Sequence, residues 1–190
     1  IKSDKKERGF TIINKISTSF SNLSWERTAE NPDLIKIFLK NELEKNQKIE
    51  VDINYRLVFP NSKMHDYGYS SNKAYTIKNF LLRVTPFVNG SFERDSNLNF
   101  DDQFNTYDDI SMDVIIPLKY IFHSNCIDSQ NIVGDRKIIN FNCSKLKDLS
   151  CFIYKENEFE MIKNDHFNIF TNEEKIVSIK DESFKRINTF

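Results

Sequence analysis

The chain has 190 residues, and its 27 Lys and Arg against 28 Asp and Glu give a formal net charge of −1. This length is typical of one domain and is enough to bury a core without disulfide bonds or metal ions. The hydrophobic fraction of 39% excludes a fully disordered chain, and the sequence has no apolar run long enough for a membrane-spanning helix. The balanced charge argues against a surface built as a whole for nucleic acid or anionic lipid.

Asn, Ile and Lys dominate the composition. The chain has 22 Asn, 23 Ile and 20 Lys but only two Ala, at Ala29 and Ala74. Codons for the three abundant residues are AT-rich, which indicates the AT-rich genome of a microbe or a virus. No signal peptide is visible and the chain does not begin with Met, so the sequence leaves the localisation open.

Residues 1–9 are highly charged, so we expect a flexible tail followed by a single β-rich domain over 10–190. The first strand is expected at 10–16. The segment 32–46 has the pattern of an amphipathic helix. Asn31 is a good N-cap, Pro32 suits the first helical position, and Asp33 complements the positive end of the helix dipole. Apolar residues recur at helical spacing at Leu34, Ile35, Phe38, Leu39 and Leu43.

Two runs alternate apolar and polar residues with the period of a β-strand, at 49–59 and 112–122. Pro117 cannot donate a backbone hydrogen bond, so the second run must lie at a sheet edge or break there. Ile115 and Ile121 fall opposite the core-facing set of that run. This pattern predicts that a second surface covers the other face.

Shorter strand patterns follow at 75–88, 137–143, 151–155, 158–162, 167–170 and 175–179. With only four Gly in the chain, Asn is the next residue that tolerates the left-handed region, and turns are expected at Asn61, Asn89, Asn131, Asn157 and Asn172. We therefore predict a β-rich α+β fold. It is an antiparallel β-sandwich or distorted barrel, with the helix at 32–46 packed on a sheet.

The three cysteines are Cys126, Cys143 and Cys151. One interpretation pairs Cys143 with Cys151 across a short loop in an oxidising compartment, and the other leaves three buried thiols. Three glycosylation sequons begin at Asn22, Asn89 and Asn142, which is the number that chance predicts for a chain so rich in Asn.

The densest polar and aromatic segment is the loop 61–72. We predict it as a recognition loop, with His65, Tyr67 and Tyr69 as interaction residues, because Tyr rings provide contact area at low entropic cost. Pro117 is the fourth predicted interaction residue.

Motifs for chemistry are weak. The acidic stretch 93–109 lacks the spacing of an EF-hand and is expected to be a solvated loop, and the three His show no zinc pattern. Nucleophile elbows and phosphate-binding loops are absent, and only a nucleophilic pair of Cys126 with His166 stays open. The sequence therefore predicts no catalytic residue, no metal site and no cofactor.

The favoured function is a non-enzymatic interaction or assembly module that acts through a sheet face, a sheet edge or the loop 61–72. Its expected partner is another protein or a further copy of the chain. One alternative is a small hydrolase or nuclease. A second is an OB-like barrel that binds single-stranded nucleic acid through Lys78, Arg83, Arg94, Lys119 and Arg136.

The run 116–122, followed by the strand pattern 137–143, resembles a segment of the jelly-roll capsid proteins of large DNA viruses. The resemblance covers only residues 116–143 and includes no catalytic motif. It implies a jelly-roll viral structural protein as a further alternative.

Overall fold

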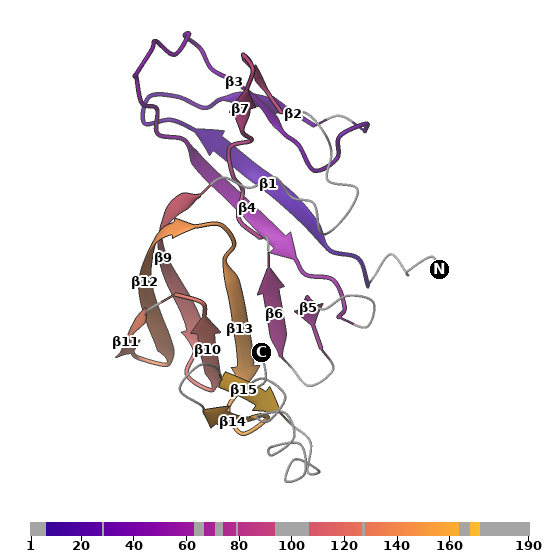
Figure 1. The fold of residues 1–190 in the computed structure, drawn as a ribbon, viewed down its shortest axis with the longest axis vertical. Helices are drawn as coiled ribbons and strands as arrows, with labels where there is room; N and C mark the ends of the chain where they lie inside the picture. The colour runs from indigo at the N-terminus through magenta and orange to yellow at the C-terminus, as the bar shows by residue number, and fades with distance from the viewer. Residues whose placement is uncertain are drawn as a thin grey trace, which may run out of the picture.

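The structure is a computed structural model that describes residues 7–27, 29–62, 67–70, 74–78, 80–93, 107–126, 128–163 and 168–171. Within these residues the chain forms fifteen strands and no α-helix (Figure 1). The strands are β1 Phe10–Ser17, β2 Ser24–Glu26, β3 Lys36–Phe38, β4 Asp52–Val58, β5 Gly68–Tyr69, β6 Tyr75–Lys78, β7 Phe87–Val88, β8 Ser91–Phe92, β9 Asp108–Pro117, β10 Tyr120–Ser124, β11 Asp128–Val133, β12 Arg136–Leu146, β13 Ser150–Lys155, β14 Glu160–Lys163 and β15 Asn168–Thr171.

Two sheets enclose the core. One has four strands in the order β10-β13-β6-β5, and the other has three in the order β11-β12-β9. The rings of Phe122 on β10 and Phe141 on β12 stack with centroids 5.9 Å apart, which joins the two sheets directly. The buried cluster between them consists of Ile77, Ile116, Phe122, Ile139, Phe141, Leu149 and Cys151. Each large apolar side chain buried in this way contributes about 1.5–3 kcal/mol.

Strands β1 and β4 form a separate antiparallel ribbon, which runs diagonally across the upper part of the molecule in Figure 1. Along β4, Ile53, Tyr55 and Leu57 are half-buried, whereas the residues between them are exposed. The predicted strands at 10–16 and 49–59 are therefore confirmed, and the second is shortened to 52–58.

The helix expected at 32–46 is wrong. This segment contains β3, which pairs with β2 so that Trp25 lies opposite Ile37. Asn31 and Pro32 begin a turn that is closed by a 3.2 Å bond from the Leu34 amide to the Asn31 carbonyl. Asn-Pro-Asp is a turn signal as well as a helix start, and the sequence does not distinguish the two.

The segment 32–46 is not helical because of its tertiary environment. An amphipathic helix this short depends on an apolar surface that covers its stripe. Phe38, Leu39 and Leu43, three members of the stripe, are 39%, 38% and 46% exposed, so the described residues provide no such surface for them. A turn at Glu44–Gln47 follows, in which Asn46 has a φ of 66°.

The α+β class is wrong as well, since the described residues contain no α-helix. A closed barrel is also wrong, because the sheets are small and open. The described strands are divided among six sheets, four of them with only two strands, rather than between the two broad sheets expected for a sandwich.

The alternation at 112–122 is real but belongs to two strands. It ends in β9 at Pro117, turns at Leu118 and Lys119, and continues in β10, which joins the other sheet. The predicted break at Pro117 is confirmed, and β9 is an edge strand.

The remaining strand predictions are met unevenly. Strand β6 ends at Lys78, β7 is only two residues long, and residues 80–86 are not in a strand, so the expected strand at 75–88 is largely wrong. The patterns at 137–143, 151–155, 158–162 and 167–170 correspond to β12, β13, β14 and β15. The pattern at 175–179 lies outside the described residues.

Turn chemistry follows the predicted use of Asn in part. Asn89 and Asn157 have φ values of 52° and 69° and lie in turns, as expected. Asn131 lies within β11, so its predicted turn is wrong. Asn61 forms a bridge with Tyr69, and Asn172 lies outside the described residues.

A close junction joins the β1–β4 ribbon to the four-stranded sheet. The Asn61 amide donates to the Glu7 carbonyl at 3.0 Å, and the Tyr69 amide donates to the Pro60 carbonyl at 2.9 Å. Gly68 is buried there with a φ of 115°, and a Cβ at this position would overlap the Pro60 carbonyl oxygen. The backbones approach so closely that only glycine fits.

Strand β12 contains a β-bulge between Cys143 and Leu146. Lys145 lies in the bulge with a φ of 54°, and its amide donates to the Asp109 Oδ1 at 3.0 Å. The guanidinium of Arg83 donates to the Lys147 carbonyl and forms an ion pair with Asp108, both at 2.5 Å. Three segments are thereby held together where β12 bends.

We expect Lys145→Gly to raise the free energy of unfolding by about 0.5 kcal/mol, because relief of the left-handed strain of about 1–2 kcal/mol exceeds the added entropy of the unfolded chain. Lys145→Val should lower it by about 1–2 kcal/mol, because a β-branched residue tolerates positive φ poorly. Urea denaturation checks both changes. Ser144→Val is the control at an exposed neighbour without positive φ, and an equal loss in Ser144→Val and Lys145→Val would contradict the strain at Lys145.

Candidate binding edge at strand β9

Strand β9 presents two different faces. Ile110, Met112 and Val114 pack against the buried core cluster, to which Ile116 itself belongs. The alternate residues of the strand point to the outer face, and these are Asp109, Ser111, Asp113, Ile115 and Pro117, all exposed. This face therefore has carboxylates toward the start of the strand and apolar side chains toward its end.

The apolar end continues across the sheet. Pro117 lies opposite Arg136 on β12, and Arg136 lies opposite Val133 on β11. Ile115 is 56% exposed and Val133 is 60% exposed. We call Ile115, Pro117 and Val133 the apolar patch. These side chains lie at the end of a sheet face and next to the edge of β9, where a partner strand on that edge would contact them.

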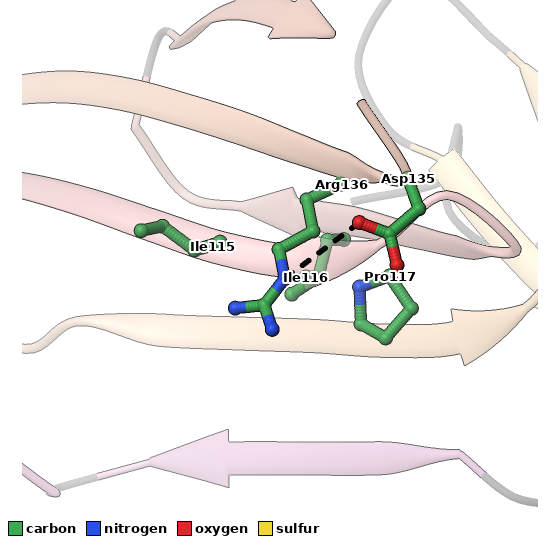
Figure 2. A pocket seen from close by; sticks show the side chains of 5 residues that line it. All are labelled: Ile115, Ile116, Pro117, Asp135 and Arg136. Carbon is green, nitrogen blue, oxygen red and sulfur yellow. Dashed lines mark ion pairs between the residues drawn. The ribbon is translucent and has the colours of Figure 1, made fainter. Parts of the chain in front are cut away.

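A shallow pocket of about 250 Å³ lies at this patch (Figure 2). Ile115, Ile116 and Pro117 line it together with Asp135, in the turn before β12, and Arg136, the first residue of β12. The Arg136 Nε and the Asp135 Oδ1 are 4.0 Å apart, and both side chains are exposed. Pockets for drug-sized ligands usually measure about 300–1,000 Å³, so this one suits a single side chain of a partner better than a whole small molecule.

The acidic end of the face is ordered by hydrogen bonds. The Asn140 Nδ2 donates to the Asp113 Oδ1 at 2.6 Å, and Asp109 accepts the Lys145 amide. Both carboxylates belong to exposed residues, so they remain open to a cation in a partner. Because they are held in place, the binding of a partner does not have to restrict them further.

The edge of β9 is the third element. Among the described strands, β9 pairs with β12 alone, in a register that runs from Pro117 opposite Arg136 to Asp108 opposite Leu146. In an antiparallel strand at a sheet edge, every second residue directs its amide and carbonyl away from the sheet. Pro117 ends this row because it has no amide hydrogen.

The structure places the predicted interaction residues in different sheets. Pro117 ends β9, whereas Tyr69 belongs to β5, where it pairs with Tyr75. Tyr67 is half-buried next to Gly68, and His65 lies outside the described residues. The described part of the loop 61–72 is thus joined to Pro60 and β6 by backbone bonds rather than projecting freely.

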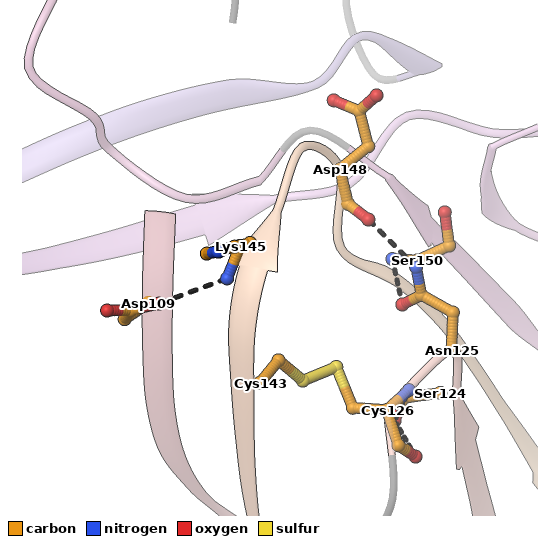
Figure 3. The surroundings of a disulfide bond; sticks show 8 residues. All are labelled: Asp109, Ser124, Asn125, Cys126, Cys143, Lys145, Asp148 and Ser150. Atoms are coloured by element: carbon orange, nitrogen blue, oxygen red, sulfur yellow. Dashed lines mark hydrogen bonds between the residues drawn. A yellow bond between two sulfur atoms is a disulfide. The ribbon is translucent and has the colours of Figure 1, made fainter. Parts of the chain in front are cut away.

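A disulfide bond joins Cys126 to Cys143, so both interpretations of the cysteines, the pairing of Cys143 with Cys151 and three buried thiols, are wrong (Figure 3). Cys126 follows β10 and Cys143 lies in β12, so the bond connects the two core sheets. The side chain of Asn125 holds the turn at Cys126, donating to the Asp148 carbonyl at 2.8 Å and accepting the Ser150 amide at 3.1 Å. With its sulfur in the disulfide, Cys126 cannot act as a nucleophile, and His166 lies outside the described residues.

Cys151 is free and buried, 4% exposed. Desolvation raises the pKa of its thiol to about 12, so almost no reactive thiolate is present at neutral pH. The pKa of Tyr154 is also raised by burial, and its ring stacks on His123 with centroids 5.9 Å apart. Phe152 and Phe159 pack against Tyr154 as well, so these aromatic groups cover the face of β13 that points away from the core.

Sequence reasoning missed β11 and therefore missed Val133. Ser129, Gln130 and Asn131 are polar, so the alternation that marks a half-buried strand is absent. The signal that could have found the hairpin is Gly134-Asp135, a two-residue loop with Gly134 at a φ of 62° and with Val133 paired to Arg136.

Comparisons with protein-family models, with curated proteins and with solved structures found no match to this chain. Within the described residues, no three His, Cys, Asp or Glu side chains are grouped in a way that could hold a metal ion. No helix in that part of the chain is long and apolar enough to cross a membrane. The fold and the β9 edge therefore carry the functional argument alone.

Proposed function

We propose that this chain is a non-enzymatic binding module that adds an extended segment of a partner protein to the edge of β9 that no other described strand pairs with. One observation supports the proposal above the others. A single edge strand carries exposed carboxylates, Asp109 and Asp113, toward its start, and Ile115 and Pro117 at its end.

The chemistry of the edge selects its partner. In strand addition, backbone hydrogen bonds provide affinity and alternate side chains provide specificity. A partner strand would place basic residues beside Asp109 and Asp113 and an apolar residue beside Ile115. Asp109, Asp113 and Ile115 share one face of β9, so the partner residues beside them also lie on one face, at every second position. The partner is therefore an extended segment that carries basic residues toward one end of that face and apolar residues toward the other, and its binding should weaken as salt is added.

The other functions have less support. The open sheets remove the closed barrel on which the nucleic-acid alternative depended. A hydrolase or nuclease needs titratable groups that converge in a pocket, whereas the pocket at Pro117 is lined by one carboxylate and one guanidinium, which form an exposed ion pair.

The test uses a fluorescent ten-residue Lys-Val peptide, Thr-Val-Thr-Val-Thr-Lys-Thr-Thr-Thr-Lys, with fluorescence polarisation as the readout. In an antiparallel ladder it places its two Val beside Pro117 and Ile115 and its two Lys beside Asp113 and Asp109. We expect micromolar binding that Asp113→Lys and Ile115→Lys each weaken by about tenfold, which corresponds to about 1.4 kcal/mol. Ile132→Lys is the matched control. Ile132 is 68% exposed on β11, at the opposite edge of the same sheet, so the same substitution there should leave binding unchanged.

Two control peptides separate strand addition from other contacts. A peptide methylated at alternate backbone nitrogens cannot complete the ladder, and one with Glu in place of Lys opposes the carboxylates. We expect neither to bind. Equal binding of the methylated peptide, equal effects of Ile132→Lys and Ile115→Lys, or no binding of the Lys-Val peptide at all would each overturn the proposal.

A further inference from the structure

Strands β7 and β8, each two residues long, form a hairpin with a two-residue loop at the upper end of the molecule, where Figure 1 labels β7. Val88 pairs with Ser91, and the loop between them is Asn89-Gly90 with φ values of 52° and 81°. Two consecutive positive φ values define a type I′ turn, for which Asn-Gly is the preferred sequence. The hairpin follows from local sequence chemistry.

This hairpin exposes aromatic surface. Phe87 and Phe92 lie opposite each other with ring centroids 5.0 Å apart, and they are 63% and 52% exposed. Water contact on so much aromatic area is unfavourable, and the two rings cover each other only edge to face. Residues 89–91 between them, Asn-Gly-Ser, form an acceptor sequon.

The disulfide supplies an independent observation. The Cys126–Cys143 bond forms and persists in an oxidising compartment, which in eukaryotic cells is also where oligosaccharides are attached to Asn. The hairpin and the disulfide lie in different sheets and different parts of the sequence. The disulfide therefore indicates an oxidising compartment independently of the sequon.

The structure distinguishes the three sequons. Asn142 lies within β12 opposite Ser111, and its sequon contains the disulfide residue Cys143. Asn22 forms a bridge with Ser17 and precedes the buried Leu23. All three asparagines are exposed, but only Asn89 lies in the loop of a hairpin rather than in a strand or a bridge.

We propose that Asn89 is an N-glycosylation site and that its glycan covers Phe87 and Phe92. In the reaction, the Asn89 Nδ2 forms a bond to the anomeric carbon of a lipid-diphosphate-linked oligosaccharide. The bond from that carbon to the diphosphate oxygen breaks, the lipid diphosphate leaves, and the amide nitrogen loses one proton to the surrounding base. No oxidation or reduction takes place. The nonpolar faces of the first sugars then pack on the exposed rings.

The test uses the full chain secreted from a eukaryotic cell behind a cleavable leader, together with a known glycoprotein as a positive control. Release of glycans by an N-glycosidase in ¹⁸O-water converts each occupied Asn to labelled Asp, which mass spectrometry locates. We expect the label at Asn89. Ser91→Ala, which removes the sequon but keeps the Asn-Gly turn, should abolish it, and Asn131→Gln, outside any sequon, should not change it.

A second measurement tests the packing of the glycan. The wild-type chain should melt at least about 2 °C above Ser91→Ala, and this difference should vanish when both carry Phe87→Ser. An unmodified Asn89 beside a glycosylated control protein would overturn the site, even if Asn22 or Asn142 were occupied. An occupied Asn89 with the same melting difference in the Phe87→Ser pair would overturn the packing on the rings.

Discussion

Gly68→Ala is expected to lower the free energy of unfolding by about 2–6 kcal/mol. The added Cβ would overlap the Pro60 carbonyl oxygen, and a φ of 115° is a conformation that only glycine adopts easily. Overpacking typically costs about 1–3 kcal/mol, and backbone strain of this kind costs about 1–3 kcal/mol more. Most small domains are stable by only about 5–15 kcal/mol, so this loss removes a large part of the total stability.

Gly90→Ala and Gly134→Ala are the matched controls, measured with Gly68→Ala by urea denaturation. Both glycines have positive φ, 81° and 62°, but a Cβ at either position meets no atom within 4 Å. Each control should therefore lose only the conformational part, about 1–2 kcal/mol. A Gly68→Ala variant no less stable than Gly90→Ala would show that the junction at Pro60 is not as close as described.

Reduction of the Cys126–Cys143 bond is expected to cost about 3 kcal/mol of stability, which is within the range expected for Gly68→Ala. The two cysteines are 17 residues apart, and a loop of about 15 residues corresponds to about 3 kcal/mol of restricted entropy in the unfolded chain. The bond also connects the two sheets that enclose the core, so the loss should affect the whole cooperative unit.

The experiment compares denaturation with and without dithiothreitol in the wild type and in Cys126→Ala/Cys143→Ala. Dithiothreitol should destabilise the wild type and leave the double variant unchanged. A double variant avoids the new pair that one remaining cysteine could form with Cys151. Equal sensitivity of the two proteins to dithiothreitol would exclude a stabilising role for this bond.

Cys151 provides an internal check on the same samples. Its raised pKa and its burial predict no alkylation of the folded protein at pH 7, and one alkylated thiol after denaturation without a reductant. After denaturation and reduction, all three thiols of the chain should be alkylated. Two further thiols before reduction would contradict the disulfide.

Some of the fold was predictable because the signal is local. The alternation along β4 and β9 marks strands with one wet face, and it survives in the structure because each strand has a core on one side only. Pro117 marks a sheet edge because it lacks an amide hydrogen, so the edge position of β9 within the candidate site was predictable from this residue.

The places of Val133 and Asp109 in the candidate site were not predictable. Val133 belongs to a strand whose polar residues show no alternation, and only the pairing of β11 with β12 brings it into line with Pro117. Asp109 falls within the stretch expected to be a solvated acidic loop, because the sequence contains no sign that β9 begins at Asp108.

By itself, the sequence determined where the backbone pleats or turns: the strands at β1, β4, β9 and β12, the break at Pro117, and the left-handed turns at Asn89 and Asn157. These features depend on side-chain periodicity and on local backbone sterics, which act between neighbours in the chain. Tertiary structure decided the segment 32–46 and the disulfide partner. The apolar stripe of a helix is stable only where another apolar surface covers it. Cys143 forms a disulfide with the cysteine that the packed sheets bring next to it. Both choices depend on contacts between residues far apart in the chain, and only the packed sheets create them.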